Sequence, residues 1–429
     1  MQQGRKYSMK KIYLHIGTAK TGSSALQAFF YKNAKLLEDN GIYYPLEYGG
    51  IPFNNFLLSG GNLGPLILEK DNHDDELVEI ISSLLDKYKV ILLSSEYLWD
   101  HFDYRMEIFN GLSKLNCTVE IIVYLRPQVD YIESMYRESV ENLYSTYVEL
   151  DDFFEAINSN RSVQSEQEDS VQRIINGVKY YQRISKLCDI FGKKHIHVKI
   201  YERSQMKHQD IYEDFLDVLG IQIDNSYIYP EGTINPTLDC SLVDIRRYIN
   251  SLKGYSAAEK QDVFRDIMEN ITADKRREKN LNFKSSISNE KRNKIMSYFE
   301  SDNSRIAIEF CDKEDGVLFC EQKPSDFIPE TVTETEMLKD TIKIFSSLAF
   351  EQNRNNAQNT SFVKDLAYKV NELYNVHRIF DQKLLEIEQS NTDLKQKLLD
   401  KTNELEAIKS STCWKLTKPL RSIVQFIRK

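Results

Sequence analysis

The chain has 429 residues, of which 41% are apolar and 28% charged, and its formal net charge is −9. This length allows a substantial catalytic core plus an accessory segment. The negative charge argues against general nucleic-acid binding, which usually needs a basic face. The six cysteines form no CxxC pair and the seven histidines are dispersed, so we expect neither a disulfide framework nor a bound metal. No run approaches the roughly 18 apolar residues of a membrane span.

Strand-like and helix-like patterns alternate over about the first 320 residues. They predict an α/β fold with a P-loop-like parallel sheet flanked by helices. The first strand is predicted at 11–17, followed by a helix from about 22 to 41, and further strands at 87–96, 117–127 and 194–202. In open α/β sheets, ligands bind at the carboxyl ends of the strands. Because three of these ends carry "GTAKTGSS", "SSE" and "RP", we expect them to converge on one site.

The loop after the first strand has the composition of an anion site. Gly17 and Gly22 keep the glycine spacing of a triphosphate P-loop, but Ser23 replaces its lysine and Lys20 lies inside the loop. A strand, a glycine-rich turn and a helix start gather backbone N–H groups at the positive end of a helix dipole. The loop predicts a nucleotide with a short, metal-free 5′ anion; the alternative is a tight turn that happens to contain lysine. The predicted contacts are Gly17, Thr18, Ala19, Lys20, Thr21, Gly22, Ser23 and Ser24.

A second motif, "VYLRPQVDYIESMYRE" (123–138), follows the strand at 117–127. Arg126 comes directly after the apolar run, and Ser134 lies eight residues later in the next predicted helix. Arginine offers a rigid fork of donors to a phosphate, and a serine hydroxyl adds one more. Taken alone, Arg126 could equally be a structural ion-pair partner; after the first motif, the pair predicts a second phosphate site.

At these motifs the sequence resembles a known family. "IYLHIGTAKTGSSALQAFF" (12–30) resembles the 5′-phosphosulfate-binding loop of sulfotransferases that use 3′-phosphoadenosine 5′-phosphosulfate (PAPS), and "IIVYLRPQVDYIESMY" (121–136) resembles their 3′-phosphate motif. The similarity covers about residues 10–320. Segments 180–202, 234–238 and 298–310 resemble bacterial carbohydrate-type members of the family.

The resemblance implies a function and a role for each motif residue. It implies transfer of a sulfuryl group from PAPS, without a metal, to a hydroxyl of a carbohydrate acceptor in bacterial surface-polysaccharide modification. Lys20 would contact the 5′-phosphate and the oxygen that bridges it to sulfur, with Ser23 and Ser24 holding the same anion. Arg126 and Ser134 would hold the 3′-phosphate.

The reaction also needs a base for the acceptor proton, typically contributing about 10²–10⁴-fold. Carbohydrate-type members use a glutamate soon after the second strand, and "LLSSEYLWDHF" offers Glu96 at the strand end and His101 five residues later. We favour Glu96, because a strand-end residue points into the shared crevice. The alternative is that Glu96 pairs with Lys20 or Arg126 without moving a proton. His15 lies within the first strand, where we expect a packed core residue.

Two other functions stay open on the sequence. A Mg-ATP-dependent P-loop kinase or phosphotransferase would need the Lys-Ser/Thr pair that this loop lacks. A catalytically inactive protein recruited by a coiled coil would not need Lys20, Arg126 and Ser134, which are all present.

The chain is expected to contain four segments: a catalytic domain (1–329), a linker with a helical segment (330–365), a coiled coil (366–408) and a basic amphipathic tail (409–429). The a positions of the heptads are Val370, His377, Leu384, Asn391, Leu398 and Leu405, and the d positions are Leu366, Leu373, Phe380, Ile387, Leu394, Lys401 and Ile408. Asn391 at an a position suits a parallel homodimer. The alternative is one long helix folded back on the catalytic domain.

The tail "STCWKLTKPLRSIVQFIRK" has five basic residues and no acidic one, interleaved with apolar residues. Such a helix can lie on an anionic membrane surface. "CWKLTKPLR" also resembles a C-terminal signature of bacterial surface-polysaccharide glycosyltransferases. We therefore expect a cytoplasmic protein in peripheral contact with the inner membrane or with polysaccharide-assembly proteins; the alternative is a solvated tail.

Overall fold

The structure is a computed structural model that describes residues 9–48, 51–52, 60–69, 74–141, 150, 168–231, 287 and 289–320, with isolated residues between 243 and 265 and between 397 and 403. The chain divides into two compact units, Met1–Thr331 and Val332–Lys429. In the second unit the described residues are a few helical ones between 397 and 403. The rest of the predicted coiled coil and the whole basic tail lie outside the described residues, so both stay predictions.

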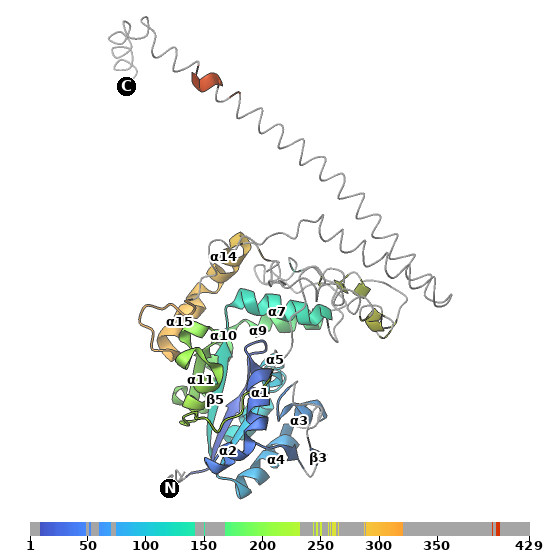
Figure 1. Cartoon of the computed structure of the whole chain (residues 1–429), viewed down its shortest axis with the longest axis vertical. Coiled ribbons are helices and arrows are strands. Elements are labelled where there is room, and N and C mark those ends of the chain that lie inside the picture. The colour runs from blue at the N-terminus through green and yellow to red at the C-terminus, as the bar shows by residue number, and fades with distance from the viewer. Residues whose placement is uncertain are drawn as a thin grey trace, which may run out of the picture. The chain divides into compact units, whose positions relative to one another are not determined.

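Four parallel strands form the central sheet of the first unit, in the order β4-β1-β5-β6. Figure 1 shows β5 of this sheet among the helices of the first unit. Their bounds are β1 Lys11–His15, β4 Val90–Ser94, β5 Thr118–Leu125 and β6 Ile196–Ile200. β1 lies between β4 and β5, with His15 opposite both Ser94 and Ile122 at its carboxyl end. The predicted fold class, a P-loop-like parallel α/β sheet, is confirmed, as are the four predicted strands.

Helices and short elements connect the strands. The helices are α1 Ser23–Lys32, α2 Ala34–Asp39, α3 Gly64–Glu69, α4 Asp74–Lys87, α5 Tyr97–Asp100, α6 Met106–Ser113, α7 Gln128–Glu141, α9 Glu168–Gly177, α10 Tyr180–Phe191, α11 Ile211–Val218, α14 Asn289–Tyr298 and α15 Glu300–Phe310. Two short strands, β2 Glu47–Tyr48 and β3 Ile51–Pro52, pair antiparallel. Three 3₁₀ turns are η1 Lys193–His195, η2 Arg203–Gln205 and η3 Lys207–Gln209.

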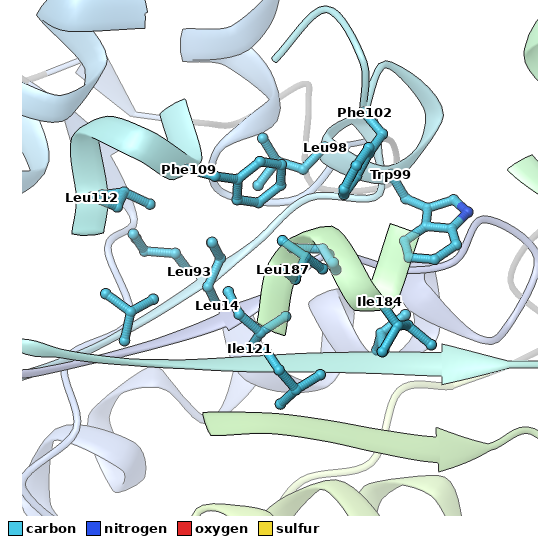
Figure 2. Packing of buried hydrophobic residues seen from close by; sticks show 14 of the residues in the cluster. Leu14, Leu93, Leu98, Trp99, Phe102, Phe109, Leu112, Ile121, Ile184 and Leu187 are labelled. Atoms are coloured by element: carbon cyan, nitrogen blue, oxygen red, sulfur yellow. The ribbon is translucent and has the colours of Figure 1, made fainter. Parts of the chain in front are cut away.

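Successive residues of β1 point to opposite faces of the sheet and belong to two separate apolar clusters, as strand geometry requires. Leu14 joins a cluster with residues of α5, α6 and α10, and Figure 2 shows Leu14 and Leu93 packed beneath Phe109, Leu112 and Leu187. On the opposite face, Tyr13 packs with residues of α1, α2 and α11. The sheet is therefore covered on both sides, as expected for parallel strands.

The predicted single helix from 22 to 41 is wrong in one respect: it is two helices, α1 and α2, separated at Asn33. The Asn33 amide nitrogen donates to the carbonyl oxygens of Phe29 and Ile228, both at 2.8 Å, and its side-chain oxygen accepts from the Ile228 N–H at 2.8 Å. This buried asparagine thus ties a distant segment to the helix end. The backbone turns there because asparagine side chains compete with helical hydrogen bonds.

Candidate active site

The polar strand ends lie at one edge of the sheet because the strands are parallel. The loop after β1 first continues along β5: the Thr18 N–H donates to the Tyr124 carbonyl at 3.0 Å, and the Tyr124 N–H donates to the Gly17 carbonyl at 2.7 Å. Arg126 follows β5 directly, and Glu96 follows β4 by two residues. The loop, Glu96 and Arg126 are therefore brought together, as the strand-end rule predicts.

The loop backbone adopts conformations that favour glycine at several places. φ is 101° at Gly17, 62° at Lys20 and 78° at Gly22. A side chain on Gly22 would be strained at this φ, and its Cβ would lie 2.7 Å from Ile211 Cδ1, which would have to shift. Gly22 is also the N-cap residue of α1, and no side chain caps this helix start. Helix starts with a glycine-rich entry are common anion-binding positions in proteins.

Two hydroxyl groups of the loop turn inward. Thr21 Oγ1 donates to the Thr18 carbonyl at 2.6 Å, and Ser23 Oγ donates to the same oxygen at 3.1 Å. Both side chains are buried, whereas Ser24 is half-buried. Thr21 and Ser23 thus shape the loop in this structure; the prediction that these hydroxyls contact a 5′ anion stays a prediction.

Arg126 and Lys20 are joined through the loop backbone. Arg126 Nη1 donates to the Lys20 carbonyl at 2.8 Å, while Arg126 Nε is buried with no hydrogen-bond partner among the described residues. The Lys20 ammonium lies 3.1 Å from Glu138 Oε1 on α7. Ser134 precedes Glu138 by one helical turn and so shares its face of the helix. The structure therefore links Lys20 to Arg126 through the loop backbone and to the face of α7 that also carries Ser134.

Glu96 packs directly against the loop. A Cβ on Gly17 would lie 3.2 Å from Glu96 Cβ. The carboxylate accepts one hydrogen bond at each oxygen: Gln27 Nε2 donates to Oε2 at 2.7 Å, and the Gly60 N–H donates to Oε1 at 3.2 Å. Lys20 is paired with Glu138, and the donors to Glu96 among the described residues are neutral. This geometry favours a carboxylate held by neutral donors over an ion pair between Glu96 and Lys20.

The sequence reasoning missed the support of Glu96 by the segment "GGN" at 60–62. Asn62 is fully buried; its Nδ2 donates to the Leu92 carbonyl at 3.1 Å, and its Oδ1 accepts from the Ser94 N–H at 2.8 Å. A Cβ on Gly61 would lie 2.2 Å from the Ser94 carbonyl oxygen, so only glycine allows this approach. A glycine pair signals a turn, but nothing in the sequence tells which strand the turn meets.

Asp100, the last residue of α5, is a second carboxyl group near Glu96. Shielding from water raises the pKa of Asp100 to about 7, with the negative charges of Glu138 and Glu96 adding to the shift. The Tyr131 hydroxyl donates to Asp100 Oδ1 at 3.4 Å. His101, the alternative base, follows at the end of the same helix, with its ring centroid 6.4 Å from that of Tyr97. A group that changes charge near neutral pH thus lies one turn beyond Glu96.

A buried arginine, Arg183, contacts α5 and holds it in place. Arg183 Nη1 donates to the Trp99 carbonyl at 2.5 Å, and the Arg183 guanidinium lies 5.2 Å from the Trp99 ring centroid. The Trp99 indole N–H donates to the Gly177 carbonyl at 3.0 Å. These contacts fix the short helix that begins directly after Glu96, so the carboxylate is attached to a rigid element.

Comparisons with known proteins find distant structural likenesses. No family model and no curated protein sequence matches the chain. Among solved structures, a sulfotransferase from Alicyclobacillus acidocaldarius is similar at 15% identity, covering 56% of this chain and 92% of that one, with a TM-score of 0.32. The sulfotransferase domain from the curacin biosynthetic pathway is similar at 12% identity, covering 61% and 98%, with a TM-score of 0.31.

The described part of the chain has neither a membrane-spanning helix nor a cluster of metal ligands. Its helices include none long and apolar enough to cross a membrane. Its histidine, cysteine, aspartate and glutamate residues form no group that could hold a metal ion.

Proposed function

We propose that this protein is a PAPS-dependent sulfotransferase that transfers the sulfuryl group to a hydroxyl of a carbohydrate acceptor in bacterial surface-polysaccharide modification. One observation carries the proposal: a carboxylate with neutral partners, Glu96, packs on the first glycine of an anion loop that contains Lys20. A base and a cation at one loop are what transfer from a phosphosulfate to a hydroxyl requires.

The residues present fit a donor with anions at both ends. The buried Arg126 Nε lacks a partner among the described residues, and a phosphate oxygen would satisfy it. The start of α1, which follows the glycine-rich loop at Gly22, would hold the other anion. Ser134, on the same face of α7 as Glu138, would add a hydroxyl donor to the 3′-phosphate. Two separate anion-binding elements suit PAPS, which has an anionic group at its 5′ and at its 3′ position, better than a ligand with one anionic group.

Each site residue has a chemical task in this proposal. PAPS supplies the sulfuryl group, which leaves the 5′-phosphate and becomes bonded to the acceptor oxygen. Glu96 accepts the proton of the acceptor hydroxyl as that bond forms. Lys20 stabilises the negative charge that the 5′-phosphate keeps when its bond to sulfur breaks; such preorganised charge is often worth about 10²–10³ in rate.

Assembly and location belong to the same proposal. Segment 366–408 would form a parallel coiled coil between two copies of the chain. The basic tail at 409–429 would hold the dimer at the cytoplasmic face of the membrane or against polysaccharide-assembly proteins. The support for both is the heptad pattern and the charge pattern of the sequence.

Calorimetry with adenosine 3′,5′-bisphosphate, in the presence of a chelator, tests the donor assignment. We expect the wild type to bind and Arg126→Ala to bind about 10–100-fold more weakly, because charge-assisted hydrogen bonds are lost. Arg105→Ala is the matched control: Arg105 donates to the Ile67 carbonyl at 3.1 Å and pairs with Asp74, away from the loop. Binding of Mg-ATP but not of the bisphosphate would favour a kinase and overturn the proposal.

A further inference from the structure

We infer that Gln27 positions the Glu96 carboxylate for catalysis, as the central member of a buried hydrogen-bond chain that runs from His15 through Ser94. The inference rests on the proposed function, because it assigns a task to Glu96. Gln27 is a positioning residue here: it acts on the acceptor proton only through Glu96.

Gln27 lies between the Glu96 carboxylate and the Ser94 hydroxyl. It lies on the face of α1 that covers the sheet and is fully buried. Its Nε2 is 2.7 Å from Glu96 Oε2 and 3.2 Å from Ser94 Oγ. An ionised carboxylate only accepts hydrogen bonds, so the amide nitrogen must face Glu96. The amide therefore joins the end of β4 to the proposed base.

The Ser94 hydroxyl is held by His15 on the adjacent strand. Ser94 and His15 are register partners on adjacent strands, and Ser94 Oγ lies 2.8 Å from His15 Nδ1. Complete burial lowers the pKa of His15 to about 3, so its imidazole is neutral near pH 7. A neutral imidazole has one N–H and one acceptor nitrogen, and with either tautomer Ser94 Oγ keeps a lone pair that can accept from Gln27. Gln27 is therefore the donor both to Ser94 and to Glu96.

The buried hydrogen-bonded group of His15, Ser94 and Gln27 contains polar atoms that destabilise the fold. Gln27 Oε1 and His15 Nε2 are both buried and have no hydrogen-bond partner among the residues that the structure describes. A buried polar group that stays unpaired destabilises the fold, because it has given up its hydrogen bonds to water. Of the other buried residues of α1, Leu26, Phe29 and Phe30 are apolar, and the one polar residue, Ser23, has its hydroxyl paired with the Thr18 carbonyl. Stability alone therefore does not explain an amide at this position, whereas orientation of Glu96 does.

The turn at 60–62 confines the Gln27 side chain. A Cβ on Gly61 would lie 2.6 Å from Gln27 Nε2, so the turn at 60–62 packs directly on the amide. The same turn supplies the Gly60 N–H to the other oxygen of Glu96. The carboxylate is thus held at both oxygens, by Gln27 from one side and by the turn from the other.

Gln27→Met tests the inference, because methionine is unbranched and of similar length but has no N–H. The assay is single-turnover consumption of PAPS, first with water as acceptor and then with whichever sugar in a panel of monosaccharides reacts fastest. We expect the rate to fall about 10–100-fold, as small misplacement of a reacting group does. Binding of adenosine 3′,5′-bisphosphate should change less than about 2-fold, since the donor contacts stay intact.

A double-mutant cycle separates positioning from a merely structural role. If Gln27 acts through Glu96, Gln27→Met should cost less than about 2-fold in a Glu96→Gln background. Ser94→Ala, which removes the anchor and leaves Glu96 in place, should give a smaller loss that also vanishes in that background. It keeps the test open should Gln27→Met fail to fold. Asn303→Leu removes a buried amide that pairs with Gln128 elsewhere and should leave the rate unchanged.

The outcomes distinguish this inference from the proposed function. An active wild type in which Gln27→Met costs the same factor with Glu96 or Gln at position 96 overturns the inference and leaves the function intact. The inference is also wrong if Gln27→Met and Ser94→Ala leave the rate unchanged. A wild type that neither binds the bisphosphate nor consumes PAPS overturns the function and this inference together.

Discussion

Two glutamates at opposite ends of the sheet have contrasting partners. Glu96 follows the carboxyl end of β4 and accepts hydrogen bonds from two neutral groups, the Gln27 amide and the Gly60 N–H. Glu120 lies near the amino end of β5, where its carboxylate is 2.9 Å from His197 Nε2, 3.3 Å from His195 Nδ1 and 3.4 Å from the Lys11 ammonium. One carboxylate has polar neighbours and the other has basic ones.

The difference teaches what each glutamate can do. Burial alone would raise the pKa of Glu120, but the hydrogen bond from His197, the charge of Lys11 and the contact with His195 lower it to about 2. A carboxylate held in that way stays ionised and serves as an ion-pair partner. Neutral donors, by contrast, fix the direction of the Glu96 carboxylate without placing a counter-charge on it. We infer that Glu120 stabilises the fold and that Glu96 is arranged for proton transfer.

The largest expected effect is on turnover. Glu96→Gln keeps the size of the side chain but cannot take up a proton, so PAPS consumption should fall about 10²–10⁴-fold. Glu120→Gln is the matched control at the other end of the sheet and should leave turnover within about 2-fold. Rates measured for both variants under single-turnover conditions check this. Similar losses in the two variants would break the comparison, and an active Glu96→Gln would shift the role of base to His101.

The next effect in size is on stability at acid pH. Here Glu120→Gln should show the effect, and Glu96→Gln should be the control. The folded-state pKa of Glu120, about 2, lies below its ordinary value of 4.5. Its carboxylate therefore stabilises the fold above pH 4.5, and this contribution is lost as the pH falls towards 2. Because the cluster is partly open to solvent, we expect it to be worth about 1 kcal/mol.

Urea unfolding at pH 5.5, 4 and 3 measures this effect. Glu120→Gln should be less stable than the wild type at pH 5.5, and the difference should shrink at each lower pH. A difference that stays constant with pH would mean that the ionisation of Glu120 is not what stabilises the fold. Glu96→Gln, whose partners are neutral, serves as the reference variant.

Local patterns predicted the parts of the site that lie next to strand ends. Lys20, Glu96 and Arg126 each follow an apolar run, and a parallel sheet brings such positions to one edge. The partners of Glu96 could not be predicted in this way. Gly60 reaches Glu96 across 36 residues. Ser94 meets His15 across 79 residues because of strand register, which no local pattern specifies.

The same reasoning explains the missed role of His15 and the missed helix break. His15 was expected in the core and is fully buried there, yet its ring nitrogen completes a polar chain that starts at the site. Asn33 ends α1 because its amide meets a segment 195 residues away. Composition and periodicity record which face of an element is buried. They do not record which polar groups meet once two buried faces are packed together.

The smallest expected effect concerns the lysine of the loop. Lys20 is paired with Glu138 at 3.1 Å, and both side chains are about one-third exposed, so the pair is worth at most about 1 kcal/mol. An anion bound at the loop would compete with Glu138 for the ammonium. Glu138→Gln should therefore tighten the binding of adenosine 3′,5′-bisphosphate, by up to about 5-fold, measured by calorimetry at low salt. Glu38→Gln, which removes a partner of Lys35, makes the same charge change elsewhere and should have no effect.

A second background shows whether the tightening passes through Lys20. In Lys20→Ala the ammonium is gone, so adding Glu138→Gln should change the affinity only by the general loss of one negative charge, which rising salt screens. Equal tightening with and without Lys20 would mean that Glu138 acts as a diffuse repulsive charge on the anion. Loss of the effect in Lys20→Ala would instead sharpen the contrast between the two ends of the sheet. A bound anion would then replace Glu138 as the partner of Lys20, whereas the ion pairs around Glu120 stay in place as part of the fold.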